Sequence, residues 1–197
     1  MLAKRLESLN PYVPGEQPKD RVYVKLNANE NPYPPSPAVS KAITEAVNTR
    51  SHLLALYPDP DSTELRQSFA QMLNKTGGVF CNGHQYLVGE KESDFHITPD
   101  MVFCGNGTDE VLSFIFYSFF GSEAPLVLPE FTYSFYPVYA GFYNIPLKRI
   151  PLKSDWSFDI NTMMSEVKKD SCGMIFANPN APTGIGLSCK NIDKMLQ

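Results

Sequence analysis

The chain has 197 residues, 43% of them hydrophobic and 19% charged, and its formal net charge at pH 7 is −4. This length is enough to bury a real core within one domain. The mild negative charge offers no clustered basic face for nucleic acid or an anionic membrane, and no apolar run approaches the roughly 20 residues of a membrane span. The four cysteines are scattered without a CxxC pair, which is typical of reduced thiols. We therefore expect a cytoplasmic protein that binds neither nucleic acid nor membrane.

Residues 1–35 are rich in proline and lack a sustained period, so they predict an extended arm. A helix is expected after Ser36, a favourable N-cap residue, with Pro37 in its first turn. A second helix is expected after Asp61, because Asp61 and Glu64 have the spacing of a capping box. Apolar residues recur at the helical period in both helices, so each should bury one face. These faces consist of Val39, Ala42, Ile43, Ala46 and Val47 in the first helix and Leu65, Phe69, Met72 and Leu73 in the second.

Residues 76–98 interrupt this pattern with four glycines and no persistent period. A structureless loop longer than about 12–15 residues is uncommon in a compact domain. We therefore interpret this segment as an insertion that contains a small hairpin through residues 85–88. Within it, Cys81 and His84 have ligand-like spacing, but no second pair completes a zinc site, so no metal is expected.

From residue 100 onwards, short apolar strands alternate with helices, which predicts an α/β domain with a mainly parallel sheet. The expected strands are 101–103, 126–128, 145–147 and 174–177, and the expected helices are 108–120, 133–141, 159–168 and one from Ser188. Ligands of such sheets bind outside the carboxyl ends of the strands. Three turns qualify as ligand sites: 104–109, 129–133 and 178–184.

The turn at 104–109 has the composition of an anion site. Gly105 and Gly107 permit a close backbone approach and positive φ. Thr108 and Asp109 then open a helix, whose free N–H groups and dipole favour a phosphate. The segment is neither a P-loop nor a dinucleotide fingerprint, and an ordinary helix cap explains it equally well.

The other two turns add a flat ring and polar amides. Tyr133 follows a strand end, where its ring either stacks on a planar ligand or packs in the core. Residues 178–184 contain two asparagines whose amides can donate to a ring oxygen, although a turn of this composition is ordinary on its own. A planar ligand with a phosphate and a polar ring substituent would satisfy all three turns, and pyridoxal phosphate fits that description.

Residues 106–110, 129–133 and 178–184 resemble, in the same order, three signatures of the fold-type I aminotransferases. Three further segments resemble the histidinol-phosphate aminotransferase family in particular: Leu9–Gly15, Lys25–Pro32 and Leu56–Pro60. The resemblance covers nearly the whole chain except residues 76–98.

This resemblance implies the front part of a fold-type I pyridoxal-phosphate-binding large domain in residues 36–197, interrupted by the insertion at about 76–98. Residues 1–35 would form an arm on the substrate side. The implied cofactor is pyridoxal 5′-phosphate, and the implied reaction moves an amino group between L-histidinol phosphate and 2-oxoglutarate in histidine biosynthesis. The resemblance also implies a homodimer.

The resemblance assigns cofactor roles to Gly107, Thr108, Asp109, Tyr133, Asn180 and Tyr57, and substrate roles to Tyr12, Asn29 and Glu30. The Thr108 and Asp109 N–H groups would hold the cofactor phosphate, and the Tyr133 ring would stack on the pyridine ring. Tyr57 would reach the phosphate of the partner subunit's cofactor. The implied role of Asn180 is to bond the cofactor's phenolic oxygen, because Ala181 stands where the family has an asparagine for that bond.

No lysine of the chain lies in the context that the family uses for its Schiff-base lysine, which is expected beyond Gln197. The chain is therefore expected to be a truncated N-terminal part that is inactive alone. Two alternatives remain open. The protein could be another class I/II aminotransferase or a phosphoamino-acid decarboxylase, or it could be a non-catalytic truncated relative.

Overall fold

The computed structural model describes residue 16 and residues 18–26, 30–75, 79–81, 84–86, 96–121 and 123–196. The chain divides into two compact units: Val13–Glu64 forms the smaller one, and Met1–Tyr12 with Leu65–Gln197 forms the larger one. None of the helices in the described ranges is long and apolar enough to cross a membrane. All three candidate turns lie in the larger unit.

The smaller unit contains α1 (Pro37–Arg50) and the short 3₁₀ helix η2 (Ser51–Ala55). Helix α1 begins where the sequence predicts, after an extended Ser36 and with Pro37 in its first turn. The prediction that α1 buries one face is wrong, because none of its residues is buried and its apolar stripe stays largely exposed. Within the described part of this unit the next helix is η2, and its own leucines are exposed as well.

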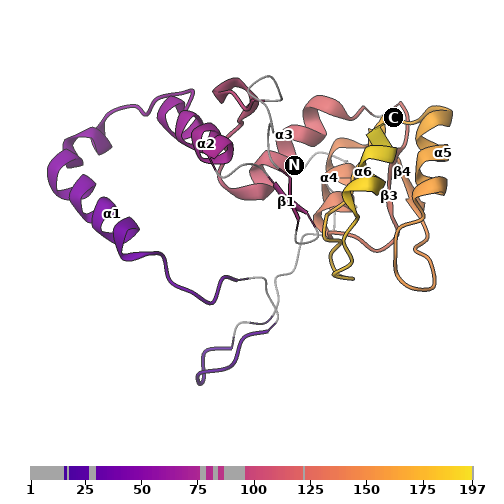
Figure 1. Cartoon of the computed structure of the whole chain (residues 1–197), viewed down its shortest axis with the longest axis horizontal. Helices are drawn as coiled ribbons and strands as arrows, with labels where there is room; N and C mark the ends of the chain where they lie inside the picture. The colour runs from indigo at the N-terminus through magenta and orange to yellow at the C-terminus, as the bar shows by residue number, and fades with distance from the viewer. Residues whose placement is uncertain are drawn as a thin grey trace, which may run out of the picture. The chain divides into compact units, whose positions relative to one another are not determined.

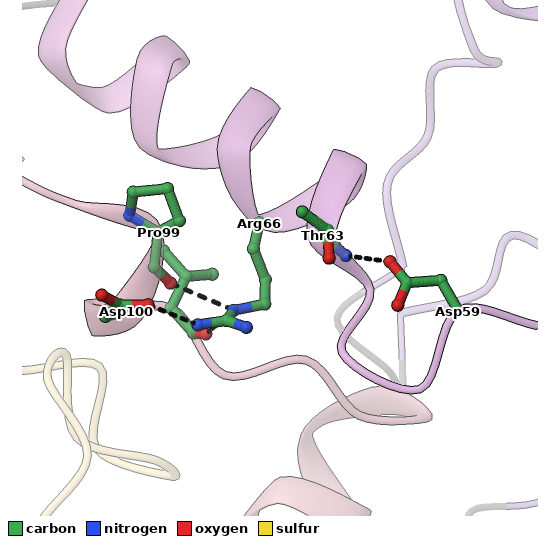
Figure 2. Close-up of polar contacts among 6 residues, drawn as sticks. Asp59, Thr63, Arg66, Pro99 and Asp100 are labelled. Carbon is green, nitrogen blue, oxygen red and sulfur yellow. Dashed lines mark hydrogen bonds and ion pairs between the residues drawn. The ribbon is translucent and has the colours of Figure 1, made fainter.

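Helix α2 (Thr63–Lys75) is confirmed, and the side chain of a preceding residue binds its first N–H group. The Thr63 N–H donates to Asp59 Oδ2 at 2.7 Å, as Figure 2 shows, so Asp59 satisfies the first N–H group of the helix. Ala70 is the buried residue of this helix. Leu65, Phe69 and Met72 remain about half exposed, so the predicted buried face is wrong at these positions.

Arg66 of α2 fixes the segment that leads into the first candidate turn. Its Nε donates to the carbonyls of Pro99 (3.0 Å) and Val102 (2.8 Å), and its Nη2 lies 3.3 Å from Asp100 Oδ1 (Figure 2). Residues Pro99–Met101 form the 3₁₀ helix η3, and residues 102–105 are irregular. The strand predicted at 101–103 is therefore wrong, because a side chain rather than a neighbouring strand binds the Val102 carbonyl.

Part of the predicted insertion is a hairpin. Strands β1 (Val79–Cys81) and β2 (His84–Tyr86) pair antiparallel, with Val79 opposite Tyr86 and Cys81 opposite His84. The hairpin is confirmed, although it lies closer to the N-terminus than the predicted 85–88. Residues 87–95 lie outside the described residues.

The larger unit has a three-stranded sheet in the order β4-β3-β5, and both pairings are parallel. Its strands are β3 (Leu126–Pro129), β4 (Leu147–Ile150) and β5 (Gly173–Met174). The helices around it are α3 (Gly107–Phe119), α4 (Phe135–Tyr143), α5 (Ile160–Asp170) and α6 (Cys189–Leu196). Each helix begins within two residues of its predicted start, so the predicted α/β fold with a parallel sheet is confirmed.

The side chains of β3 alternate between two cores. Leu126 and Leu128 pack with Phe116 of α3 in one cluster, which also contains residues of α4. Val127 packs with Met163 of α5 in a second cluster, to which α6 contributes. Helices α3 and α4 therefore cover one face of the sheet and α5 the other, as Figure 1 shows. This alternation makes β3 the centre of a three-layer unit.

Cys104 and Cys172 are free thiols, whereas Cys189 is disulfide-bonded. The prediction of reduced cysteines is therefore wrong at Cys189. Spacing along the chain does not reveal which cysteines a fold brings together.

We expect the bonds of Arg66 to the two carbonyls to stabilise the larger unit more than its ion pair with Asp100 does. Substituting Arg66→Met leaves two carbonyls without their charged donor, so the free energy of unfolding should fall by about 1.5–3 kcal/mol. Asp100→Ala removes only the ion pair of a side chain that is 96% exposed, and should cost less than about 1 kcal/mol. Urea denaturation of both variants measures the difference, and equal losses would contradict the role given to the carbonyl bonds.

Candidate functional site

The first turn leaves open space at the start of α3. Gly107 has φ +80°, and a Cβ placed on it would have no heavy atom within 4 Å. The Asn106 side chain makes no capping bond to the helix. The first N–H groups of a helix have no partner inside the helix, so those of Thr108 and Asp109 are available to a ligand.

Two tyrosine hydroxyls, one from the second turn and one from α4, bind Asp109 of the first turn. Tyr133 Oη donates to Asp109 Oδ1 at 3.2 Å. Tyr139 Oη, from α4, donates to the Asp109 carbonyl at 2.6 Å. The Tyr133 ring also stacks on Phe135, with centroids 5.7 Å apart and an interplanar angle of 21°. The structure therefore brings the predicted residues Tyr133 and Asp109 together.

The Tyr139 hydroxyl is suited to donate. Burial raises the pKa of Tyr139 above its ordinary value, and the neighbouring Asp109 and Tyr143 raise it further. A tyrosine hydroxyl is protonated at neutral pH even at its ordinary pKa, and the upward shift extends that range, so Tyr139 can donate to the Asp109 carbonyl.

Asn180 connects the third turn to the second, and this residue is only 2% exposed. Its Nδ2 donates to the Phe131 carbonyl at 3.0 Å and to Thr183 Oγ1 at 3.1 Å. The main chain closes the same turn, because the Gly184 N–H donates to the Asn180 carbonyl at 2.7 Å. Both amide hydrogens of Asn180 are therefore engaged within the protein.

Two buried acceptors near these turns have no partner among the described residues: Asn180 Oδ1 and Thr132 Oγ1. A buried polar atom without a hydrogen bond is costly and requires an explanation. Asn180 Oδ1 can accept a hydrogen bond but cannot donate one. What Asn180 offers a ligand is thus an acceptor, and not the donor that the sequence predicts for a phenolic oxygen.

The remaining predicted residues lie in the smaller unit or outside the described residues. Tyr57 has a fully exposed side chain. Glu30 forms an ion pair with Lys25, with 2.6 Å between Oε1 and Nζ. Tyr12 and Asn29 are outside the described residues. The roles of these four residues stay predictions.

Glu110 and Tyr139 have no predicted role from the sequence, although both side chains contact the first turn. Glu110 stands inside the motif that carries the resemblance, and its position one helical turn after Asn106 could have suggested a capping contact. Nothing local marks Tyr139, which contacts a residue 30 positions earlier.

The chain is similar to known proteins of one family. The sequence model of the class I and II aminotransferase family matches residues 21–197. A histidinol-phosphate aminotransferase of Syntrophus aciditrophicus (strain SB) is 48% identical over 197 residues, which is 100% of this chain and 48% of that relative. Another, from Acinetobacter baumannii (strain AYE), is 42% identical over 192 residues, which is 98% of this chain and 46% of that relative.

A solved structure gives the same fold. The histidinol-phosphate aminotransferase of Sinorhizobium meliloti, determined in complex with pyridoxal-5′-phosphate, matches with a TM-score of 0.66 at 22% identity, over 86% of this chain and 39% of that chain. The chain belongs to the class I and II aminotransferase family. It spans about half the length of the curated relatives it matches.

The Asn180 contacts predict a measurable loss of stability. Substituting Asn180→Ala leaves the Phe131 carbonyl without its donor, so the free energy of unfolding should fall by about 1–3 kcal/mol. A matched control is Asn161→Ala, because Asn161 is exposed and its side-chain oxygen accepts from the Lys194 ammonium group at 2.7 Å; this change should cost less than about 0.5 kcal/mol. If urea denaturation gives equal losses, Asn180 does not hold the two turns together.

Proposed function

We propose that the intact protein is a pyridoxal 5′-phosphate-dependent transaminase that moves an amino group between L-histidinol phosphate and 2-oxoglutarate in histidine biosynthesis. Membership of the class I and II aminotransferases supports the cofactor and the reaction class. The relatives at 48% and 42% identity, which are named histidinol-phosphate aminotransferases, support the amino donor. The acceptor, 2-oxoglutarate, is carried over from the family resemblance.

The observation that carries this proposal is the connection of three separate turns through two side chains. Tyr133 joins the second turn to the first at Asp109, and Asn180 joins the third turn to the second at Phe131. An uncapped helix start with open space at Gly107 suits the phosphate end of the cofactor. The unpartnered Asn180 Oδ1 suits a polar group of the ring end. The residues present therefore fit pyridoxal phosphate.

When bound, pyridoxal phosphate supplies the electron sink that amino-group transfer requires. The N–H groups of Thr108 and Asp109 would hold its phosphate, assisted by the positive end of the α3 dipole. The Tyr133 hydroxyl is tied to Asp109, which limits rotation of the ring that would stack on the cofactor. Asn180 would act as a buried acceptor and as the residue that orients the third turn.

The substrate side and the partner subunit belong to the same proposal. Tyr12, Asn29 and Glu30 of the arm would contact the substrate. Tyr57, whose side chain is fully exposed, would reach the cofactor phosphate of the partner subunit in a homodimer. The lysine that bonds to the cofactor would lie in the half of the relatives' length that this chain does not span. The enzyme would act in the cytoplasm on small-molecule substrates.

The test is a transamination assay on the intact protein. With pyridoxal phosphate, histidinol phosphate and 2-oxoglutarate, we expect glutamate to form. Tyr133→Ala should lower kcat/KM by at least about tenfold, since it removes the stacked ring. Tyr117→Ala, which removes an exposed tyrosine of α3, should leave kcat/KM nearly unchanged.

Two outcomes would contradict the proposal. Glutamate formed from an aromatic amino acid but not from histidinol phosphate would indicate another class I/II aminotransferase. Absence of turnover with any amino donor, in a protein that still binds pyridoxal phosphate, would indicate a non-catalytic relative.

A further inference from the structure

The Glu110 side chain folds back over the first turn. Its Oε2 accepts from the Asn106 N–H at 2.5 Å. A Cβ placed on Gly105 would lie 3.1 Å from the same oxygen and 2.9 Å from Val111 Cγ2. The carboxylate therefore lies against the turn although the residue remains exposed, and a side chain at position 105 would require Val111 or Glu110 to shift.

This contact decides which backbone donors remain for a ligand. The Asn106 N–H is used by Glu110, and the Gly107 N–H donates to the Gly105 carbonyl at 2.9 Å. The next two N–H groups along the chain, those of Thr108 and Asp109, are the first that the turn does not consume. The carboxylate thus fixes the bend immediately before them.

We propose that Glu110 is a positioning residue for phosphate recognition: by holding the Asn106 N–H it sets the direction of the Thr108 and Asp109 donors. This rests on the proposed function, because it assumes that the ligand at this turn carries a phosphate. Glu110 does not contact the phosphate itself.

Charge and geometry act in opposite directions at this position. A carboxylate near the start of a helix stabilises the helix through its favourable interaction with the helix dipole, but it repels a phosphate bound close by. A glutamine would accept the same bond from Asn106 without the negative charge. If geometry is the function of Glu110, a glutamine at this position should preserve phosphate recognition, and an alanine should not.

The alternative role is plain stabilisation of α3. Loss of a capping contact would weaken the helix and lower the affinity for any ligand of the site to a similar degree. A positioning role for the phosphate has a narrower consequence, because it affects only ligands that carry the phosphate. Comparing pyridoxal 5′-phosphate with pyridoxal, which lacks that group, separates the two roles.

The experiment measures the dissociation constants of both compounds with the intact apoprotein by isothermal titration calorimetry. We expect the unsubstituted protein to prefer pyridoxal 5′-phosphate over pyridoxal. Glu110→Ala should reduce this preference by about tenfold, the loss expected when misdirected backbone donors weaken charge-assisted bonds. Glu110→Gln should retain the preference, and so should the control Asp193→Ala on α6, where Asp193 is exposed.

Each outcome bears on one of the two proposals. An unsubstituted protein without any preference for the phosphorylated compound would overturn the proposed cofactor site itself. A clear preference that survives Glu110→Ala unchanged would overturn only the role of Glu110. If Glu110→Ala does not fold, Glu110→Gln and Glu110→Met provide the same comparison, and equal preference in these two variants would overturn the positioning role.

Discussion

Burial of β3 is the constraint on which the larger unit depends. Leu126, Val127 and Leu128 are all fully buried, and they alternate between two cores that hold helices on both faces of the sheet. Strands β4 and β5 pair in parallel on either side of β3, so the carboxyl ends of all three strands meet at one edge. The loops that leave this edge are thereby brought together, which is where parallel sheets place their ligands.

Two hydrogen bonds join the three turns that lie at this edge. Asn180 to Phe131 and Tyr133 to Asp109 connect the three turns in series, so a displacement of any turn strains its neighbour. The Asn180 bond is part-buried, because Asn180 itself is buried, whereas the Tyr133 bond is exposed. Because water competes less for a buried bond, the Asn180 link contributes more to stability, whereas the Tyr133 link chiefly sets the orientation of a ring.

The sequence predicted those features that depend on local pattern. The strand at 126–128, the helix from 108 and the three turns follow from short-range periodicity and from glycine and proline positions. The missed features depend on distant partners. Arg66 binds the carbonyl of Val102, which lies 36 positions later, where the sequence predicts a strand pairing. Asn180 donates both amide hydrogens within the protein, one of them to the carbonyl of Phe131, which lies 49 positions earlier. No local pattern encodes such pairings, and the exposure of the α1 stripe likewise depends on what packs against it.

The proposed function requires that the start of α3 holds the phosphate of pyridoxal phosphate. The direct test is a crystal structure of the intact protein with this cofactor. We expect phosphate oxygens within about 3 Å of the Thr108 and Asp109 backbone nitrogens, with the cofactor ring against Tyr133. A cofactor whose phosphate lies elsewhere, with no anion at the start of α3, would contradict the proposed cofactor site.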